Sequence, residues 1–418
     1  MRHRIIIITL LLFSYLPLIA NAQEHSTPKR IILTWEGNPA TSQSVTWRTD
    51  HKTKNPVGQI IPLGPSVREY DQDAITVQAK TEELSQNSKS VFHHTVGFKD
   101  LKQNTRYAYR VGTLNTWSEW NMFRTAGSDT GTFSFIYLGD IQNEVHKNAS
   151  ILLRTAFAHA SDARFILIAG DMTNHGYDDH LWHNFSKAFG FIPRMRPLVP
   201  VPGNHDKAKQ DEGENSIRHI APLYKAHFAL PPNGPGLDAL NETAYYIDYQ
   251  CARFVIFNSM SDKNPQQLDW LKRTLKSNKK PWLIVSHHHP LYSTGQDRDN
   301  PELRKMLSPL YEKYGVDLVL QGHDHHYGRT HKIVKNQIVS NTDKGPVYVV
   351  SVSGPKMYSH NDKFSHLMKV EVGNTQLYQI ITLNPEQLHY QSWSLDQRLI
   401  DEFKLKQSKK GTTLVEMK

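Results

Sequence analysis

Five apolar segments of the chain each stop at a break and lead into side chains that can bind metal ions. The clearest is segment 197–202, which contains three prolines and is predicted to be a short buried strand. Gly203 then permits a sharp turn, and Asn204, His205 and Asp206 follow directly. An amide oxygen is a good ligand for a hard divalent cation. In isolation, such a turn would be explained by an Asx-type hydrogen bond within the backbone.

The other four segments repeat this organisation. They lead into Asp140, Asp171, a run of three histidines and a His-x-His pair, and they span 133–138, 165–169, 282–285 and 316–320. Because ligands bind at strand ends along one edge of an α/β sheet, the five ends are predicted to surround one pocket. The donors there would be two Asp, one Asn and three His, which is enough for two metal ions that share one aspartate.

In this order, the five motifs resemble those of the calcineurin-like metallophosphoesterase superfamily, and within it most of all those of the purple acid phosphatases. The resemblance extends over most of the chain that follows the first 22 residues. It implies that Asp171 bridges two ions, that Asp140 and His325 bind the first, and that Asn204, His288 and His323 bind the second.

The three consecutive histidines, 287–289, require a choice. The family spaces valine, two residues, histidine, one residue and proline, and Val285, His288 and Pro290 match this spacing. His287 is then expected to make supporting polar contacts, and His289 is expected either to do the same or to contact the substrate.

The resemblance also implies a reaction. Two divalent ions about 3.5–4 Å apart would hold a hydroxide and a phosphoryl oxygen together and neutralise the charge that develops during attack. Manganese, iron and zinc are the ions expected with these O and N ligands. His205 is the candidate catalytic residue, because it could hydrogen-bond the phosphoryl group or protonate the leaving oxygen. Asp206 is expected to orient His205, with an ordinary surface carboxylate as the alternative.

Two positions depart from the purple acid phosphatases. Their tyrosine ligand, three residues after the bridging aspartate, is Asn174 here, and their glycine two residues after the first aspartate is Gln142. The last protein ligand of the first site is therefore Asn174, Gln142 or water. Tyr177 could replace the tyrosine only if its loop were rebuilt. Without a phenolate, the first site is expected to favour divalent ions and to lack the purple colour.

Residues 28–126 are predicted to form an all-β sandwich. Short β-branched and aromatic stretches are separated there by Asn, Gly and Pro, and they cover 30–35, 44–48, 94–98 and 105–111. The region resembles the fibronectin type III-like domain that precedes the catalytic domain in plant-type purple acid phosphatases, with Leu101, Thr105 and Tyr107 at its corner. Its expected role is to shape the mouth of the site or to mediate dimer contacts.

A linker at 127–131 leads into the predicted catalytic domain, residues 130–404. Strands alternate there with helices that are predicted over 149–160, 178–189, 265–275 and 301–314. The resemblance implies that they form a four-layer αββα sandwich. Residues 376–404 are predicted to add two or three closing strands, and the Lys-rich residues 405–418 are predicted to be a mobile tail.

Residues 1–22 have the organisation of a secretory signal peptide, with a basic start, an apolar stretch and Ala20-Asn21-Ala22 before the cut. The apolar stretch is short for a membrane span and contains Pro17. The protein is therefore predicted to be secreted or periplasmic with no stable membrane span, and an uncleaved anchor is the alternative. Because Cys251 is the only cysteine, an intramolecular disulfide is excluded and stability must come from a hydrophobic core.

The sequence thus predicts a secreted phosphoesterase that uses two divalent ions and acts on small phosphate monoesters. One alternative is a phosphodiesterase acting on nucleotides or glycerophosphodiesters, since both reactions use the same ligands. Another is a non-catalytic protein that binds a phosphate ligand at a relic site. The 49 Lys and Arg residues outnumber the 40 Asp and Glu residues, but they are spread along the chain without a patch suited to nucleic acid. A homodimer is compatible with the sequence.

Overall fold

The computed structural model describes residues 27–417 except 69, 87–88, 210–217 and 410. The predicted signal peptide at 1–22 lies outside the described residues. Among the helices that are described, none is long and apolar enough to cross a membrane.

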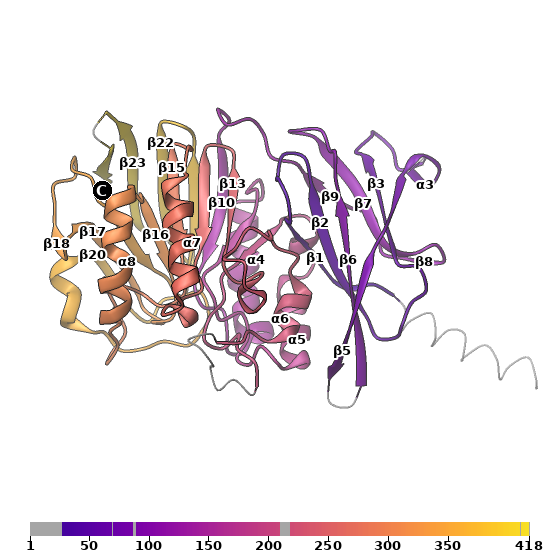
Figure 1. The fold of residues 1–418 in the computed structure, drawn as a ribbon, viewed down its shortest axis with the longest axis horizontal. Coiled ribbons are helices and arrows are strands. Elements are labelled where there is room, and N and C mark those ends of the chain that lie inside the picture. The colour runs from indigo at the N-terminus through magenta and orange to yellow at the C-terminus, as the bar shows by residue number, and fades with distance from the viewer. Residues whose placement is uncertain (1–26, 69, 87–88, 210–217, 410, 418) are drawn as a thin grey trace, which may run out of the picture.

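Residues 29–124 form a sandwich of two antiparallel sheets (Figure 1). One sheet has the order β1-β2-β6-β5, and the other has the order β4-β3-β7-β8 with β9 beside β7. The elements are β1 Lys29–Thr34, β2 Gln43–Thr49, β3 Val57–Pro62, α3 Tyr70–Asp73, β4 Ile75–Gln78, β5 Lys80–Gln86, β6 Lys89–Phe98, β7 Arg106–Thr113, β8 Thr116–Trp117 and β9 Asn121–Arg124. Trp47, Phe98 and Tyr109 belong to the core of this sandwich. At the predicted corner, the Tyr107 hydroxyl accepts a hydrogen bond of 2.8 Å from the Lys102 amide.

A seven-stranded sheet follows, in the order β12-β11-β10-β21-β22-β23-β24. Its strands are β10 Phe133–Leu138, β11 Ile166–Ile168, β12 Leu198–Pro200, β21 Leu377–Leu383, β22 Gln387–Ser394, β23 Leu399–Ser408 and β24 Gly411–Glu416. The first three are parallel, whereas β10 pairs with β21 in the antiparallel sense. The carboxyl ends of β10, β11 and β12 therefore share one edge.

An eight-stranded sheet has the order β13-β14-β15-β16-β19-β17-β18, with β20 paired to β17. Its strands are β13 Tyr245–Tyr249, β14 Ala252–Ile256, β15 Trp282–Ser286, β16 Leu318–Gln321, β17 Tyr327–Val334, β18 Gln337–Ile338, β19 Val347–Val350 and β20 Met368–Val372. Strands β14, β15, β16 and β19 are parallel. Cys251 lies buried in the turn between β13 and β14.

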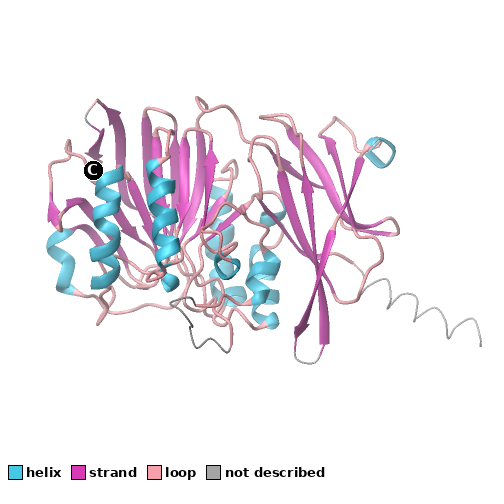
Figure 2. Cartoon of the chain, viewed as in Figure 1, coloured by secondary structure: helices cyan, strands magenta, loops and turns pink. Residues whose placement is uncertain are grey.

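The two large sheets pack face to face, with helices outside them (Figure 2). Neighbouring residues of one strand alternate between two cores, as the period of a strand requires. Ile284 of β15 joins the core that also contains Ile136 of β10, whereas Val285 joins the core that contains Leu271 and Leu307 of the covering helices. This arrangement confirms the predicted four-layer architecture.

The helices are η1 Val145–Ala149, α4 Ser150–His159, α5 Asp179–Phe189, α6 Pro222–His227, α7 Pro265–Lys276 and α8 Pro301–Tyr314, with short 3₁₀ turns at 192–194, 238–240, 259–261 and 362–367. Local sequence explains the predicted boundaries. Asn264 caps α7 by accepting a hydrogen bond of 3.0 Å from the Gln267 amide, and Pro265 occupies the first turn. Gly315 ends α8 in the left-handed conformation with φ of 69°.

The prediction of a mobile tail at 405–418 was wrong, and so was its boundary at residue 404. Residues 399–408 form β23, and 411–416 form β24 at the edge of the seven-stranded sheet. The Lys-rich composition hid an alternating pattern in which Phe403, Leu405 and Leu414 are buried in the core between the sheets while lysines such as Lys404 and Lys406 are more exposed.

Candidate metal centre

Two sheets supply the predicted ligands, and each sheet supplies one chemical kind. Oxygen donors follow the seven-stranded sheet, since Asp140 comes after β10, Asp171 after β11 and Asn204 after β12. Imidazoles follow the eight-stranded sheet, since His288 comes after β15, and His323 and His325 come after β16. The loops that carry these residues meet where the two sheets pack together (Figure 1).

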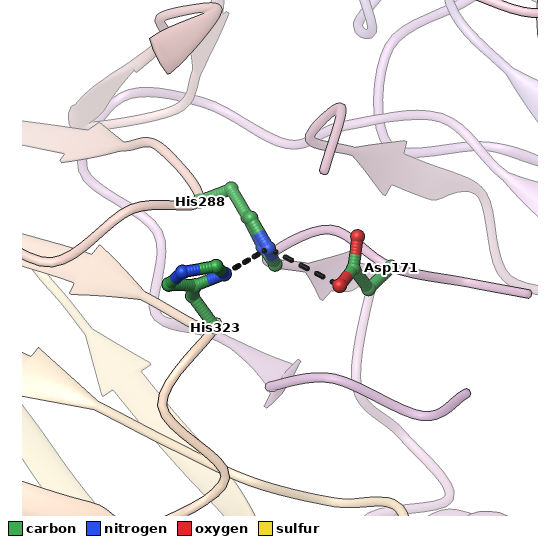
Figure 3. A group of neighbouring side chains, drawn as sticks. All are labelled: Asp171, His288 and His323. Carbon is green, nitrogen blue, oxygen red and sulfur yellow. Dashed lines mark hydrogen bonds and ion pairs between the residues drawn. The ribbon is translucent and has the colours of Figure 1, made fainter. Parts of the chain in front are cut away.

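One cluster of donors centres on His288. Its Nε2 atom lies 3.3 Å from Asp171 Oδ2, 3.1 Å from Asn204 Oδ1 and 3.1 Å from His323 Nδ1. Asp171, His288 and His323 point toward one another (Figure 3). The structure therefore brings together all the residues predicted for the second ion, together with the predicted bridging aspartate.

The hydrogen bond on the far side of the His288 ring defines what Nε2 can do. His288 Nδ1 lies 2.8 Å from the Ala169 carbonyl, which can only accept, so Nδ1 carries a proton. In the neutral ring, Nε2 then presents a lone pair to the oxygens of Asp171 and Asn204. Lone pairs converge favourably only around a proton or a cation, so these donors fit a metal ion.

The other cluster, which corresponds to the predicted first ion, contains Asp140, His325 and Gln142. His325 Nδ1 lies 3.0 Å from the Lys356 carbonyl, so its Nε2 presents a lone pair as well, 3.3 Å from Asp140 Oδ2. Within the described residues, Asp140 Oδ2 and Gln142 Oε1 are buried and have no hydrogen-bond partner. A metal ion would satisfy these atoms, so this cluster fits the predicted first ion.

The charges of the two clusters also call for a cation. Burial raises the pKa of the Asp140 carboxyl to about 7, and the charge of Asp171 adds to this effect. Burial acts to lower the pKa of His288, but the carboxylates of Asp171 and Asp140 raise it to about 10. Without an ion, a proton on His288 would balance the buried carboxylates, and a divalent cation can take over that role.

The backbone at the site is strained. Asp171, His323 and His325 have φ of 51°, 76° and 49°, a left-handed region that side chains with a Cβ atom rarely occupy. Two glycines let the carboxylates approach closely. A Cβ atom on Gly203 would lie 2.2 Å from Asp171 Oδ1, and one on Gly322 would lie 2.3 Å from Asp140 Oδ1. Other residues at these two positions would push the ligands apart.

His205 contacts Asp171, the aspartate that is predicted to bridge the ions. Its amide donates a hydrogen bond of 2.8 Å to Asp171 Oδ1, and its Nδ1 donates one of 2.7 Å to the Asn174 carbonyl. The Asn174 carbonyl therefore orients the His205 ring. The expectation that Asp206 orients it was wrong. The Asp206 carboxylate is fully buried and accepts hydrogen bonds from the amides of Gly203 and Asp171 at 2.9 and 3.1 Å, so it holds the two turns together.

The two candidates for the last ligand of the first site have different surroundings. Gln142 Nε2 lies 3.3 Å from His325 Nε2, so the Gln142 side chain is part of the cluster. Asn174 contributes its backbone carbonyl to His205, and the residue lines a separate cavity beside Glu144 and His146. Tyr177 stacks on His175 at a ring-centroid distance of 5.4 Å.

The two remaining histidines of the run have different surroundings. His287 is buried, with Nδ1 2.9 Å from the His289 carbonyl, and burial lowers its pKa to about 3. His289 Nδ1 lies 2.8 Å from Ser259 Oγ, and its ring lies 4.4 Å from that of His323 between centroids. Together with Asn204, His289 lines a cavity of about 330 Å³ that opens beside the His288 cluster.

Sequence reasoning missed three residues that contact the ligands. Arg298 donates a hydrogen bond of 2.7 Å to the His323 carbonyl, and its guanidinium lies 4.7 Å from the Tyr358 ring. Tyr358 packs edge-on against His325 at 4.9 Å, and Lys356 supplies the carbonyl that orients His325. These residues lie in loops outside the strand-end motifs, and nothing in the local sequence marks them as part of the site.

Comparison with known proteins agrees with this geometry. Residues 133–327 match the calcineurin-like phosphoesterase family, and residues 28–125 match the purple acid phosphatase N-terminal domain. The chain is 25% identical over 435 residues to acid phosphatase type 7 of Mus musculus, with 94% of each chain covered.

Two solved structures share the fold. Purple acid phosphatase PPD1 from yellow lupin (Lupinus luteus) seeds superposes with a TM-score of 0.78 and 18% identity, covering 92% of this chain and 75% of that one. The structure of PhoD superposes with a TM-score of 0.67 and 13% identity, covering 94% and 93%.

The chain is thus a calcineurin-like metallophosphoesterase, a metal-dependent hydrolase of phosphoric esters. Within that class it belongs with the purple acid phosphatase-like proteins, because it also carries their N-terminal domain.

Proposed function

We propose that this enzyme hydrolyses phosphomonoesters at a centre of two divalent ions, bound by the six strand-end ligands. The observation that carries the proposal is the convergence of Asp171, Asn204 and His323 on one nitrogen of His288, each within 3.3 Å. The ions, when bound, would supply an activated water and neutralise charge on the phosphoryl oxygens.

The roles of the ligands follow from the two clusters. Asp171 would bridge the ions, as the resemblance to the phosphoesterase family implies, and it contacts His288 at 3.3 Å. Asp140 and His325 would bind the first ion, with Gln142 favoured over Asn174 as the last protein ligand, because the Gln142 side chain contacts His325. Asn204, His288 and His323 would bind the second ion.

His205 would act on the phosphate ester. Because its Nδ1 donates to the Asn174 carbonyl, the neutral ring leaves Nε2 to accept a hydrogen bond, and the protonated ring can donate from it. A proton held at Nε2 could pass to the leaving oxygen. Asp206 would act indirectly, since it holds the turns of Gly203 and Asp171 in register.

The cavity beside Asn204 and His289 would hold the alcohol part of the substrate. Its volume of about 330 Å³ is suited to a small molecule, and its lining combines the basic Lys207, the acidic Asp262 and the apolar Met260. This mixed lining supports small esters with polar alcohol groups.

The proposal is tested by comparing an aryl phosphate with the matching bis-aryl phosphate on metal-loaded protein. We expect hydrolysis of the monoester to be favoured and to be lost in Asp171→Asn. His323→Ala should mainly lower the occupancy of the second ion. A preference for the diester would support the phosphodiesterase alternative. Phosphate binding without hydrolysis of either ester would support a binding protein.

We also propose that the protein is exported through the signal predicted at residues 1–22. The exported chain should begin at Gln23, because Ala20 and Ala22 occupy the small-residue positions before the cut. The intact mass of exported protein measures this, and membrane-bound material that retains Met1 would point to the anchor instead.

A further inference from the structure

A cavity of about 400 Å³ lies between the sandwich and the catalytic domain, away from the metal centre. Ala163 and Arg164 of its lining precede β11, and Met195 and Arg196 precede β12. The metal ligands follow these same strands. The cavity therefore lies at the opposite ends of β11 and β12 from the metal centre, and it shares no described residue with the ligand clusters.

Four arginines line this cavity. Arg106 and Arg124 come from β7 and β9 of the sandwich, whereas Arg164 and Arg196 come from loops of the catalytic domain. The only acid in the lining is Asp162, which is exposed. Both domains thus contribute positively charged arginine side chains to one cavity.

Arg124, Arg164 and Arg196 are half-buried, whereas Arg106 is exposed. Across the described residues, none of the four takes part in an ion pair. Arg196 donates to the carbonyls of Met195 and Ser161 at 2.9 and 2.5 Å. The Nε atoms of Arg124 and Arg196 are nevertheless buried without an acceptor in the described part of the chain.

Mutual repulsion adds to this cost. Burial lowers the pKa of the Arg124 guanidinium, and the charges of Arg164 and Arg106 lower it further. The pKa of Arg196 is lowered by burial and by the same two neighbours. An anion in the cavity would relieve the repulsion and accept hydrogen bonds from the buried Nε atoms.

We propose that this cavity binds a phosphate-type oxyanion, which joins the two domains. A planar guanidinium presents parallel N–H donors that match two oxygens of one tetrahedral anion, whereas a chloride ion cannot be bound in this bidentate way. The lining also includes Met122 and Phe123, which could contact the organic part of a phosphate ester. The shared chemistry is the multivalent oxyanion, free or esterified.

The test is thermal unfolding of the metal-loaded protein in chloride, sulfate and phosphate at matched ionic strength. The variant is R124Q/R196Q, and the control is R398Q, which removes an exposed arginine paired with Asp396 at 2.7 Å. Sulfate stabilises most proteins non-specifically, so the informative quantity is the difference in Tm gain between the variants.

We expect wild type and R398Q to gain about 2–5 °C more in sulfate and phosphate than R124Q/R196Q does. In chloride, R124Q/R196Q should be at least as stable as wild type, because the repulsion is reduced. Equal Tm gains in all three proteins would overturn the proposal. A Tm of R124Q/R196Q in chloride that lies well below that of wild type would overturn it too. If R124Q/R196Q does not fold, R106Q/R164Q replaces it with the same expected outcomes.

Two further measurements separate this site from the active site. Hydrolysis of the aryl phosphate should be unchanged in R124Q/R196Q assayed in chloride, so the proposed function and the anion site can fail independently. Titration of the same protein with inorganic phosphate and then with a short alkyl phosphate distinguishes the free ion from the ester. Binding of neither by wild type beyond the level seen in R124Q/R196Q would reject the site.

Discussion

His205 is the residue whose role is most open to a direct test. Its ring is held by the Asn174 carbonyl and its amide by Asp171, so removing the side chain should leave the ligands in place. We expect His205→Ala to lower kcat by about 10²–10⁴-fold, with near-normal metal content. The loss should be smaller for an aryl phosphate than for an alkyl phosphate, whose poor leaving group needs the proton.

The matched control for this variant is His175→Ala, which removes an exposed ring 6.4 Å from that of His205 and should leave kcat unchanged. Equal losses for aryl and alkyl substrates would exclude proton donation and leave phosphate binding as the role of His205.

Substitutions of Gln142 and of Asn174 are expected to affect binding of the first ion differently. The Gln142 side chain contacts His325, whereas Asn174 acts through its backbone carbonyl, which every residue retains. We therefore expect Gln142→Ala to lower the affinity for the first ion by about 10–100-fold and Asn174→Ala to have little effect on it. Metal per protein after dialysis at graded metal concentrations measures this. A larger loss in Asn174→Ala would restore Asn174 as the ligand.

Among the elements, β24 has a structural role that its composition conceals. Arg329 is buried and pairs with Asp401 at 2.7 Å and with Glu416 of β24 at 2.8 Å. Lys332 donates to the Thr412 carbonyl on the same strand. Truncation after Ser408 should therefore lower the free energy of unfolding by about 3–5 kcal/mol and expose β23 as an edge that promotes aggregation.

Denaturant unfolding of the truncated chain measures this loss. Glu416→Gln should cost less, about 1–3 kcal/mol, because the strand and its backbone bonds remain. Removal of residues 417–418 alone serves as the control and should change little. An unaltered midpoint in the chain truncated after Ser408 would show that the edge strand contributes nothing to stability.

The same elements show how far the sequence could be interpreted. The helices over 149–160 and 265–275 and the strand ends at Asp140 and Asp171 were predictable, since periodicity and caps are local properties. The position of β24 was not, because it depends on pairing with β23 and on Arg329. Arg298 and Tyr358 were also missed, because only tertiary folding brings their loops to the ligands.

At the scale of the whole molecule, the contact between the two domains contains buried histidines. Burial lowers the pKa of His93 to about 3, and the charges of Arg30 and Arg48 add to the effect. His227, stacked on Trp182 at 4.4 Å, has its pKa lowered by burial and by His93. Both rings are therefore neutral in the folded protein near neutral pH.

The unfolded chain takes up these protons at about pH 6.5, so stability is lost as the pH falls below that value toward 3. We expect the buried, neutral His93 to cost about 2 kcal/mol of unfolding free energy at pH 5. His93→Gln should reduce the difference between midpoints at pH 7 and pH 5, and His175→Gln should not. The same pH dependence in His93→Gln and wild type would place the acid-sensitive groups elsewhere.

The division of ligands between the sheets determines when in the life of the polypeptide the ions can enter. The predicted oxygen ligands Asp140, Asp171 and Asn204 leave the ribosome before the predicted histidine ligands, which are His288, His323 and His325. The strand β21, which pairs with β10 beside Asp140, is made later still. Of the six predicted ligands, a nascent chain that ends before His288 therefore offers only the three oxygen donors. These donors lie on an incomplete sheet and hold such ions weakly. We therefore expect the metal content of the enzyme to reflect the ions available in the compartment where the finished polypeptide folds.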